Sequence, residues 1–194
     1  MPPFAYLAIF FFLVGACNKV HGRENRNYEI ENNWAVIVST SRYWFNYRHV
    51  SNALSVYWIL RNLGMPDDRI ILMNAQADVG SDLRNSAPGL VLSSSDEVDS
   101  HIDLMTDARF DYLGDDVNPT TLMQVLSGRH KSGTLASARM HSNQDSNILI
   151  FITGHGGDEF LKFHDNDEIS AMDFQNVFME MHLKMRYKSI LFIV

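Results

Sequence analysis

The sequence has almost no cysteine: the only one among its 194 residues is Cys17. Cys17 lies inside an apolar amino-terminal stretch that is typical of a secretory leader, so we expect the mature chain to carry no thiol. A secreted chain without disulfides depends on its hydrophobic core for stability. It also cannot supply a thiol nucleophile of its own.

Positive charge is also scarce, since 16 Lys and Arg face 23 Asp and Glu and the net charge is −7. The cations are scattered along the chain, which disfavours nucleic acid as a partner. Two further patterns are missing, the glycine-rich phosphate loop and the serine-nucleophile elbow. The separation of His155 and His164 does not match a helical zinc site.

The amino terminus predicts export. Residues 4–17 are apolar but too short to span a bilayer comfortably, and the small residue Gly22 suits signal-peptidase cleavage. We therefore predict a signal peptide over residues 1–22 and a flexible lead-in over residues 23–33. A buried amino-terminal helix is the alternative interpretation.

Beyond the lead-in, strand and helix patterns alternate. Apolar runs predict strands, and near-helical spacing with Pro and Gly at the ends predicts helices. The predicted strands span residues 34–39, 69–73, 147–153 and 189–194, and the predicted helices span 50–63, 118–126 and 170–185. A hairpin is predicted over 160–168, and surface loops over 74–116 and 129–145. This order predicts one α/β domain, residues 34–194, with a mostly parallel sheet and helices on both faces.

The segment from Asn147 to Gly157 carries the most chemical information, because an apolar run ends at His155 among glycines. An imidazole at the end of a buried strand lies at the edge where open α/β sheets hold their active sites. The neighbouring glycines permit close backbone approach and leave an N–H to point at a substrate oxygen. A structural histidine in a glycine turn is the alternative.

Four segments, in this order, resemble the catalytic subunits of glycosylphosphatidylinositol (GPI) transamidases, a group of the legumain-like cysteine peptidases. They are residues 34–39, 43–49, 63–67 and 153–163. The joint occurrence of Asn46-Tyr-Arg-His49 and Thr153-Gly-His-Gly-Gly157 is specific. Gly154 stands where legumain has Asp, which favours the transamidase group. The resemblance implies a caspase-like three-layer αβα fold.

The resemblance also implies roles for individual residues. His155 matches the catalytic histidine, which activates a thiol and then protonates the leaving amine. Gly156 matches the position whose backbone N–H stabilises the oxyanion, and Asn46 matches the asparagine that supports the histidine. Arg48 and His49 match residues beside the substrate pocket. Alternatively, Arg48 forms an ion pair at a helix start and His49 is a packing histidine.

The nucleophile itself is missing from the sequence. In the family, the strand that resembles residues 190–194 is followed by an acidic residue, one more residue and the catalytic cysteine. We therefore expect a peptidase domain that is truncated at its carboxyl end and inactive by itself.

No cofactor is implied for the chemistry, but the resemblance implies a possible structural calcium ion. Asp67, the carbonyl of Ile70 and Asp111 match part of its ligand set. Arg109 stands where a further carboxylate is expected, so we expect calcium binding to be weakened or lost. Asp67 could equally be an ordinary turn residue after Pro66.

By resemblance, the complete enzyme removes a carboxy-terminal propeptide from a precursor protein and attaches a GPI anchor through a cysteine thioester. Its implied partners are precursor tails, the GPI glycolipid and membrane subunits on the luminal face of the endoplasmic reticulum. After signal cleavage, the truncated chain would lack a transmembrane helix. The alternatives are a legumain-type asparaginyl endopeptidase and a non-catalytic luminal isoform that acts only by binding.

Overall fold

The computed structural model describes residues 32–77, 103–105 and 107–194. The predicted signal peptide and most of the predicted lead-in lie outside these described residues. Among the helices of the described ranges, none is both long and apolar enough to cross a lipid bilayer.

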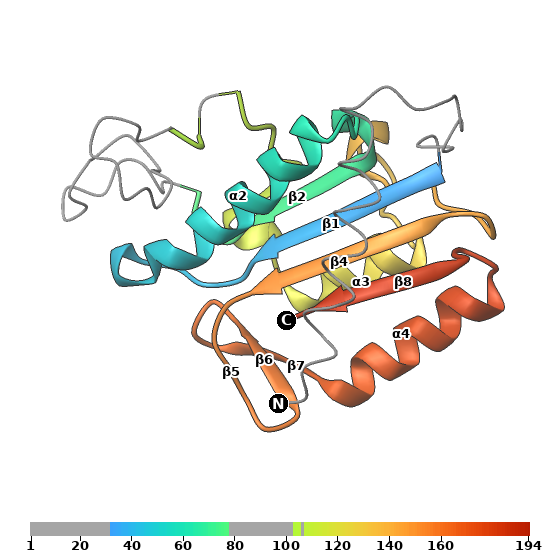
Figure 1. Cartoon of the computed structure of the whole chain (residues 1–194). Coiled ribbons are helices and arrows are strands. Elements are labelled where there is room, and N and C mark those ends of the chain that lie inside the picture. Colours follow the sequence, from blue (N-terminus) through green and yellow to red (C-terminus); the bar gives the residue numbers. More distant parts are fainter. Residues whose placement is uncertain (1–31, 78–102, 106) are drawn as a thin grey trace, which may run out of the picture.

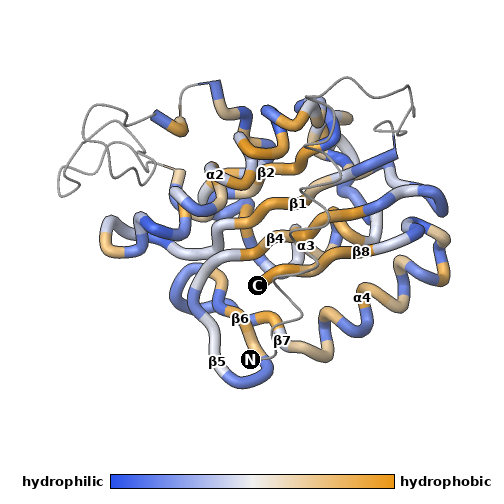
Figure 2. The backbone as a smooth tube through the Cα atoms, in the orientation of Figure 1, coloured by the Kyte–Doolittle hydropathy of each residue, from blue (hydrophilic) through white to orange (hydrophobic). Residues whose placement is uncertain are grey.

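A five-stranded sheet forms the centre of the fold, in the order β3-β2-β1-β4-β8 (Figure 1). Every neighbouring pair is parallel, so the predicted mostly parallel sheet is confirmed. The strands are β1 (Asn33–Ser39), β2 (Ile70–Asn74), β3 (Tyr112–Leu113), β4 (Asn147–Thr153) and β8 (Ser189–Ile193). Figure 2 shows how strongly apolar the middle of this sheet is.

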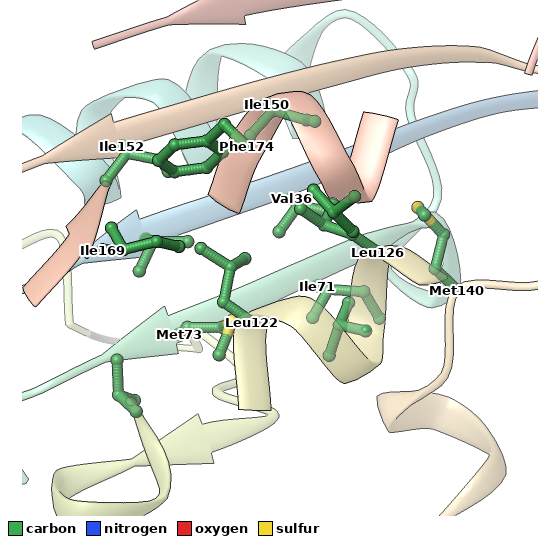
Figure 3. Packing of buried hydrophobic residues seen from close by; sticks show 14 of the residues in the cluster. Val36, Ile71, Met73, Leu122, Leu126, Met140, Ile150, Ile152, Ile169 and Phe174 are labelled. Carbon is green, nitrogen blue, oxygen red and sulfur yellow. The ribbon is translucent and has the colours of Figure 1, made fainter. Parts of the chain in front are cut away.

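Helices cover both faces, which confirms the predicted three-layer αβα arrangement (Figure 1). Alternate side chains along β1 enter opposite cores, as the two-residue repeat of a strand requires: Ile37 packs with α2, and Val36 packs with α3 and α4. The helices are α2 (Tyr47–Asn62), α3 (Pro119–Ser127) and α4 (Ala171–Leu183). Figure 3 shows the core beneath α3 and α4, including Leu122, Leu126, Ile150 and Phe174.

The predicted start of the first helix at Val50 is wrong, because α2 already begins at Tyr47. The apolar spacing used for the prediction starts only where the helix meets the sheet, whereas the preceding turn is polar and partly exposed. Arg48 and His49 therefore lie on the first turn of α2.

Local signals fix the other helices as predicted. The Asn118 side chain accepts a hydrogen bond from the Thr121 N–H, Pro119 is the first residue of α3, and Gly128 ends the helix with φ 74°. Ser170 caps α4. These signals depend on short-range contacts, which explains why the sequence reveals them.

The prediction of a surface loop with little regular structure over residues 74–116 is wrong at both ends. Asn74 is the last residue of β2, and Tyr112–Leu113 form β3, which pairs with β2. The Tyr112 hydroxyl also donates to the Ala138 carbonyl at 2.8 Å. A two-residue edge strand carries no periodic signal, so only its partner reveals it. Residues 78–102 lie outside the described residues.

A small antiparallel sheet follows β4 directly, in the order β5-β6-β7. Its strands are β5 (Gly156–Gly157), β6 (Phe160–Phe163) and β7 (Asp167–Ser170), so the predicted hairpin is confirmed. Since β5 begins one residue after His155, this sheet fixes the chain on one side of the imidazole.

Candidate active site

Two strands bring the candidate site together at the carboxyl edge of the parallel sheet. β1 and β4 are neighbours in register, with Ser39 opposite Thr153, and the Thr40 N–H donates to the Thr153 carbonyl at 3.0 Å. The chain after β1 leads to Asn46, and the chain after β4 leads to His155. Residues that are distant in sequence therefore meet where the two strands end.

Asn46 and His155 form the central contact of the site, with Asn46 Oδ1 2.8 Å from His155 Nε2. The Asn46 amide nitrogen donates to the Arg42 carbonyl at 2.7 Å, which fixes its orientation because a carbonyl only accepts. Asn46 Oδ1 must then accept, so we assign the His155 proton to Nε2. Nδ1 of His155 is thereby the basic nitrogen, as required of a general base.

Gly154 lets the backbone pass close to the end of β1. A Cβ atom at Gly154 would lie 1.9 Å from Oγ1 of Thr40 and 3.2 Å from its Cβ. A side chain at this position would force Thr40 to move, so packing favours glycine. The close approach lies one residue before His155, whose Nε2 is 2.8 Å from Asn46 Oδ1.

The backbone around His155 is held on its other side by β6. The His155 carbonyl accepts from the Lys162 N–H at 2.8 Å, and Gly156 pairs with Leu161. A Cβ atom at Gly156 would lie 2.8 Å from the Phe160 carbonyl oxygen. Gly156 is therefore also required by close packing, and its role in an oxyanion hole stays a prediction.

His49 lies behind the catalytic candidate and is 8% exposed. Its Nδ1 is 2.8 Å from Oγ1 of Thr153, and its ring meets that of His155 edge to face at 5.4 Å between centroids. Burial lowers the pKa of His49 to about 4, and the positive charges of Arg48 and His155 add to this effect. His49 is therefore neutral at physiological pH and does not repel a protonated His155.

Arg48 is exposed at the start of α2, and its guanidinium donates to the Phe45 carbonyl at 3.1 Å. The substrate-pocket roles of Arg48 and His49 stay predictions.

Sequence reasoning missed Thr40 and Thr153, which position Gly154 and His49. Hydroxyl residues at the carboxyl ends of two apolar strands were the signal that could have revealed them.

The residues of the implied calcium site lie elsewhere, around Asp67. The Tyr57 hydroxyl donates to Asp67 Oδ1 at 2.5 Å, and this contact and burial raise the pKa of Tyr57 to about 12, burial being the larger cause. The Nε atoms of Arg61 and Arg109 lie 3.9 Å and 3.8 Å from the Asp67 carboxylate. Two guanidinium groups thus already balance the charge of this carboxylate.

Asp111 faces a different partner, because its Oδ2 accepts from the Leu72 N–H at 3.0 Å. Burial raises the pKa of Asp111 to about 7, opposed by that hydrogen bond and aided by the negative charge of Asp67. Within the described ranges, no group of three or more His, Cys, Asp or Glu residues is arranged to hold a metal ion. With Arg109 beside Asp67, the residues present do not fit a divalent cation.

Comparison with known proteins agrees with this geometry. Residues 33–194 match the Peptidase C13 family. The chain is 40% identical over 193 residues to the GPI-anchor transamidase of Saccharomyces cerevisiae, covering 99% of this chain and 46% of that protein. It is 45% identical over 164 residues to the GPI-anchor transamidase of Homo sapiens, covering 84% of this chain and 40% of that protein.

A putative GPI-anchor transamidase of Drosophila melanogaster is 43% identical over 164 residues, covering 84% of this chain and 45% of that protein. The chain thus spans less than half the length of these three relatives. The family match covers the parallel sheet, Asn46 and His155 together. The chain belongs to the Peptidase C13 family, a family of cysteine-peptidase-type enzymes.

Proposed function

We propose that the chain forms the amino-terminal part of the catalytic domain of a GPI-anchor transamidase. The observation that carries this proposal is the 2.8 Å contact between Asn46 Oδ1 and His155 Nε2, at the carboxyl edge of the parallel sheet. The relatives that bear the name GPI-anchor transamidase support the choice of reaction.

In this proposal, Nδ1 of His155 takes the proton of a cysteine thiol as the thiolate attacks the carbonyl carbon of a precursor protein. The backbone N–H of Gly156 stabilises the oxyanion of the tetrahedral intermediate. The intermediate then collapses, breaks the C–N bond and leaves a thioester, while His155 returns its proton to the departing amine of the propeptide. An ethanolamine amine of the GPI lipid next attacks the thioester, forms the amide and releases the thiol.

The register of the sheet supports a position for the proposed thiol close to His155. Phe151 in β4 is paired with Ile193 in β8, and the two strands run parallel. Residues that follow β8 therefore come out beside residues that follow β4, where His155 lies. In the proposal, the cysteine follows shortly after β8, as the family resemblance implies, so the thiol and the imidazole would lie at the same edge of the sheet.

Arg48 and His49 would border the substrate in this scheme, with Arg48 exposed and His49 behind His155. The two substrates would be the carboxy-terminal tail of a precursor protein and the GPI glycolipid. The reaction would take place at the luminal face of the endoplasmic reticulum membrane, together with membrane subunits. No metal enters this scheme, since the chemistry needs only acid–base and nucleophilic groups.

The 194 residues by themselves would not transfer acyl groups, because their only cysteine, Cys17, belongs to the predicted signal peptide.

The decisive experiment compares the 194-residue chain with a chimera in which residues 23–194 are followed by the remaining part of the yeast relative. Both receive a tail peptide and an amine acceptor, and amide and acid products are separated by mass spectrometry. We expect thiol-dependent amide formation from the chimera and none from the 194-residue chain. Acid as the main product in excess amine would favour the legumain-type endopeptidase and contradict the proposal.

A further inference from the structure

Arg42 lies in the segment that leads from β1 to α2, at the edge of the sheet where β1, β2 and β4 end (Figure 1). Its side chain is 28% exposed, which is low for an arginine. The Arg42 Nε donates to the Ala75 carbonyl at 3.1 Å, and a terminal nitrogen of the guanidinium pairs with the Asp115 carboxylate. Arg42 therefore connects the end of β1 both to the end of β2 and to the turn before α3.

The two acceptors of the guanidinium differ in how firmly they hold it. Ala75 is 1% exposed, and its own N–H donates to the Ser39 carbonyl at 2.9 Å. The Asp115 side chain is 95% exposed, and its hydrogen bond with Arg42 lowers the pKa of Asp115. An ion pair that is so exposed contributes little by itself. The bond to the buried Ala75 residue is therefore the main anchor of the arginine.

The backbone carbonyl of Arg42 is directed by an unusual conformation at the next residue. Tyr43 has φ 75° and ψ 155°, which residues other than glycine rarely adopt. Rotation about the N–Cα bond of Tyr43 sets the direction of the peptide plane that carries the Arg42 carbonyl. This carbonyl accepts from the Asn46 side-chain amide at 2.7 Å. The strained conformation at Tyr43 thus accompanies the bond that orients Asn46.

Hydrogen bonds therefore run without a break from the Arg42 side chain to the candidate base. Asn46 is 3% exposed, and its Oδ1 lies 2.8 Å from His155 Nε2. An amide can turn over and exchange its oxygen and its nitrogen. A turned Asn46 would donate to Nε2 of His155, which would move the ring proton to Nδ1 and remove the basic nitrogen. The Arg42 carbonyl opposes this exchange, because it can accept a hydrogen bond but cannot donate one.

We propose that Arg42 is a positioning residue of the candidate active site. Its guanidinium holds the segment after β1 in place, so that its carbonyl keeps Asn46 in the orientation that leaves Nδ1 of His155 free. Arg42 acts through Asn46 and does not react itself. This inference rests on the proposed function, because only a reaction that uses Nδ1 gives this orientation a purpose.

The first measurement is the ring tautomer of His155 in the 194-residue chain, read from its two ring nitrogens by ¹⁵N NMR. We expect the Nε2–H form alone in the wild type. Arg42→Gln shortens the side chain and removes both anchors, so the Nδ1–H form should appear beside it. Arg42→Lys keeps the positive charge but has a single nitrogen for two acceptors, so it should lie between the two.

The second measurement is a double-mutant cycle on kcat of the chimera, with Arg42→Gln and Asn46→Ala. Arg42→Gln alone should lower kcat about threefold to tenfold with little change in KM. In the Asn46→Ala background the same change should alter kcat less than about twofold, because the residue through which Arg42 acts is already gone. A general role in stability predicts equal losses in both backgrounds.

Arg129→Gln is the matched control, because Arg129 also pairs with a carboxylate, that of Glu180, but on α4. It should keep the wild-type tautomer and kcat. A wild-type tautomer in Arg42→Gln, or equal losses of kcat in both backgrounds, would overturn the proposal. If Arg42→Gln does not fold, the tautomer of Arg42→Lys decides by the same criterion. An inactive chimera together with the Nδ1–H form in Arg42→Gln would refute the proposed function and support the positioning role.

Discussion

Asn46 and His155 are 109 positions apart in the chain, yet Asn46 Oδ1 lies 2.8 Å from His155 Nε2. Their contact exists because β1 and β4 are neighbouring parallel strands that end in register. The asparagine amide is oriented by the Arg42 carbonyl, so it fixes both the ring orientation and the tautomer of the histidine. Nδ1 of His155 is thereby left unprotonated, as the proposed mechanism requires.

Replacing Asn46 by Ala should leave His155 in place but free to rotate and change tautomer. Because the proposed role of Asn46 is to position the base without reacting, we expect kcat of the chimera to fall about 10- to 100-fold with a smaller change in KM. Steady-state kinetics with the tail peptide measures this split. Asn143→Ala, a change in the loop before β4, is the control. Equal losses in both variants would show that the effect is general destabilisation.

Gly154→Ala should destabilise the fold, because its Cβ would lie 1.9 Å from Thr40 Oγ1. We expect a loss of about 2–4 kcal/mol in the free energy of unfolding, as for other overpacked core positions. Thr40→Ala removes the clashing oxygen, so it should restore about half of that loss in the double variant. Urea unfolding of the four proteins gives the coupling energy. Simple additivity would contradict the close contact.

His49 should make stability depend on pH. Its pKa falls from 6.5 to about 4 on folding, so the unfolded chain takes up a proton first as the pH drops. The stabilisation of the folded state that comes from the neutral, buried His49 is fully present above pH 6.5. It is lost as the pH falls toward about 4. The full shift corresponds to about 3 kcal/mol, and we expect about 1–2 kcal/mol after allowing for solvent.

The measurement compares unfolding free energies of wild type and His49→Gln between pH 4 and pH 7. Wild type should lose stability more steeply across this window, because glutamine does not titrate there. Parallel curves would mean that His49 is as easily protonated in the folded chain as in the unfolded one.

Arg109→Glu should create a cation site that the wild-type residues do not form. The change removes the guanidinium whose Nε lies 3.8 Å from Asp67 and adds a second carboxylate at the same side-chain position beside Asp67. At calcium concentrations about 100-fold above its Kd, the variant should gain about 2.7 kcal/mol, which raises its unfolding midpoint by about 5 °C. Arg109→Gln, which removes the charge without adding a ligand, should not respond. Calcium stabilisation of the wild type would contradict the assignment.

The sequence predicts most of the fold because the main signals are local. The apolar run over residues 34–39 determines β1, and the Asn118 cap and Gly128 determine the two ends of α3, all through neighbouring residues. The start of α2 at Tyr47 was missed because the apolar spacing begins only at Val50. The strand at Tyr112 was missed because it depends on pairing with β2, far along the chain. The candidate base His155 was visible as a histidine among glycines.

The geometry of the site was only partly predictable. The need for glycine at position 154 comes from Thr40, and the neutral state of His49 comes from burial against Thr153. Neither fact follows from spacing, because both require β1 and β4 to be side by side. The backbone strain at Tyr43 was equally hidden, since tyrosine gives no sign of a positive φ.

The most direct test of the account is the rate of thioester formation by the chimera with and without His155→Ala. A labelled tail peptide is mixed with each protein, and the trapped acyl-enzyme is quantified by mass spectrometry before amine is added. We predict that the alanine variant forms the thioester at least about 100-fold more slowly, because the base is gone. An undiminished rate would show that His155 is not the base and would contradict the account.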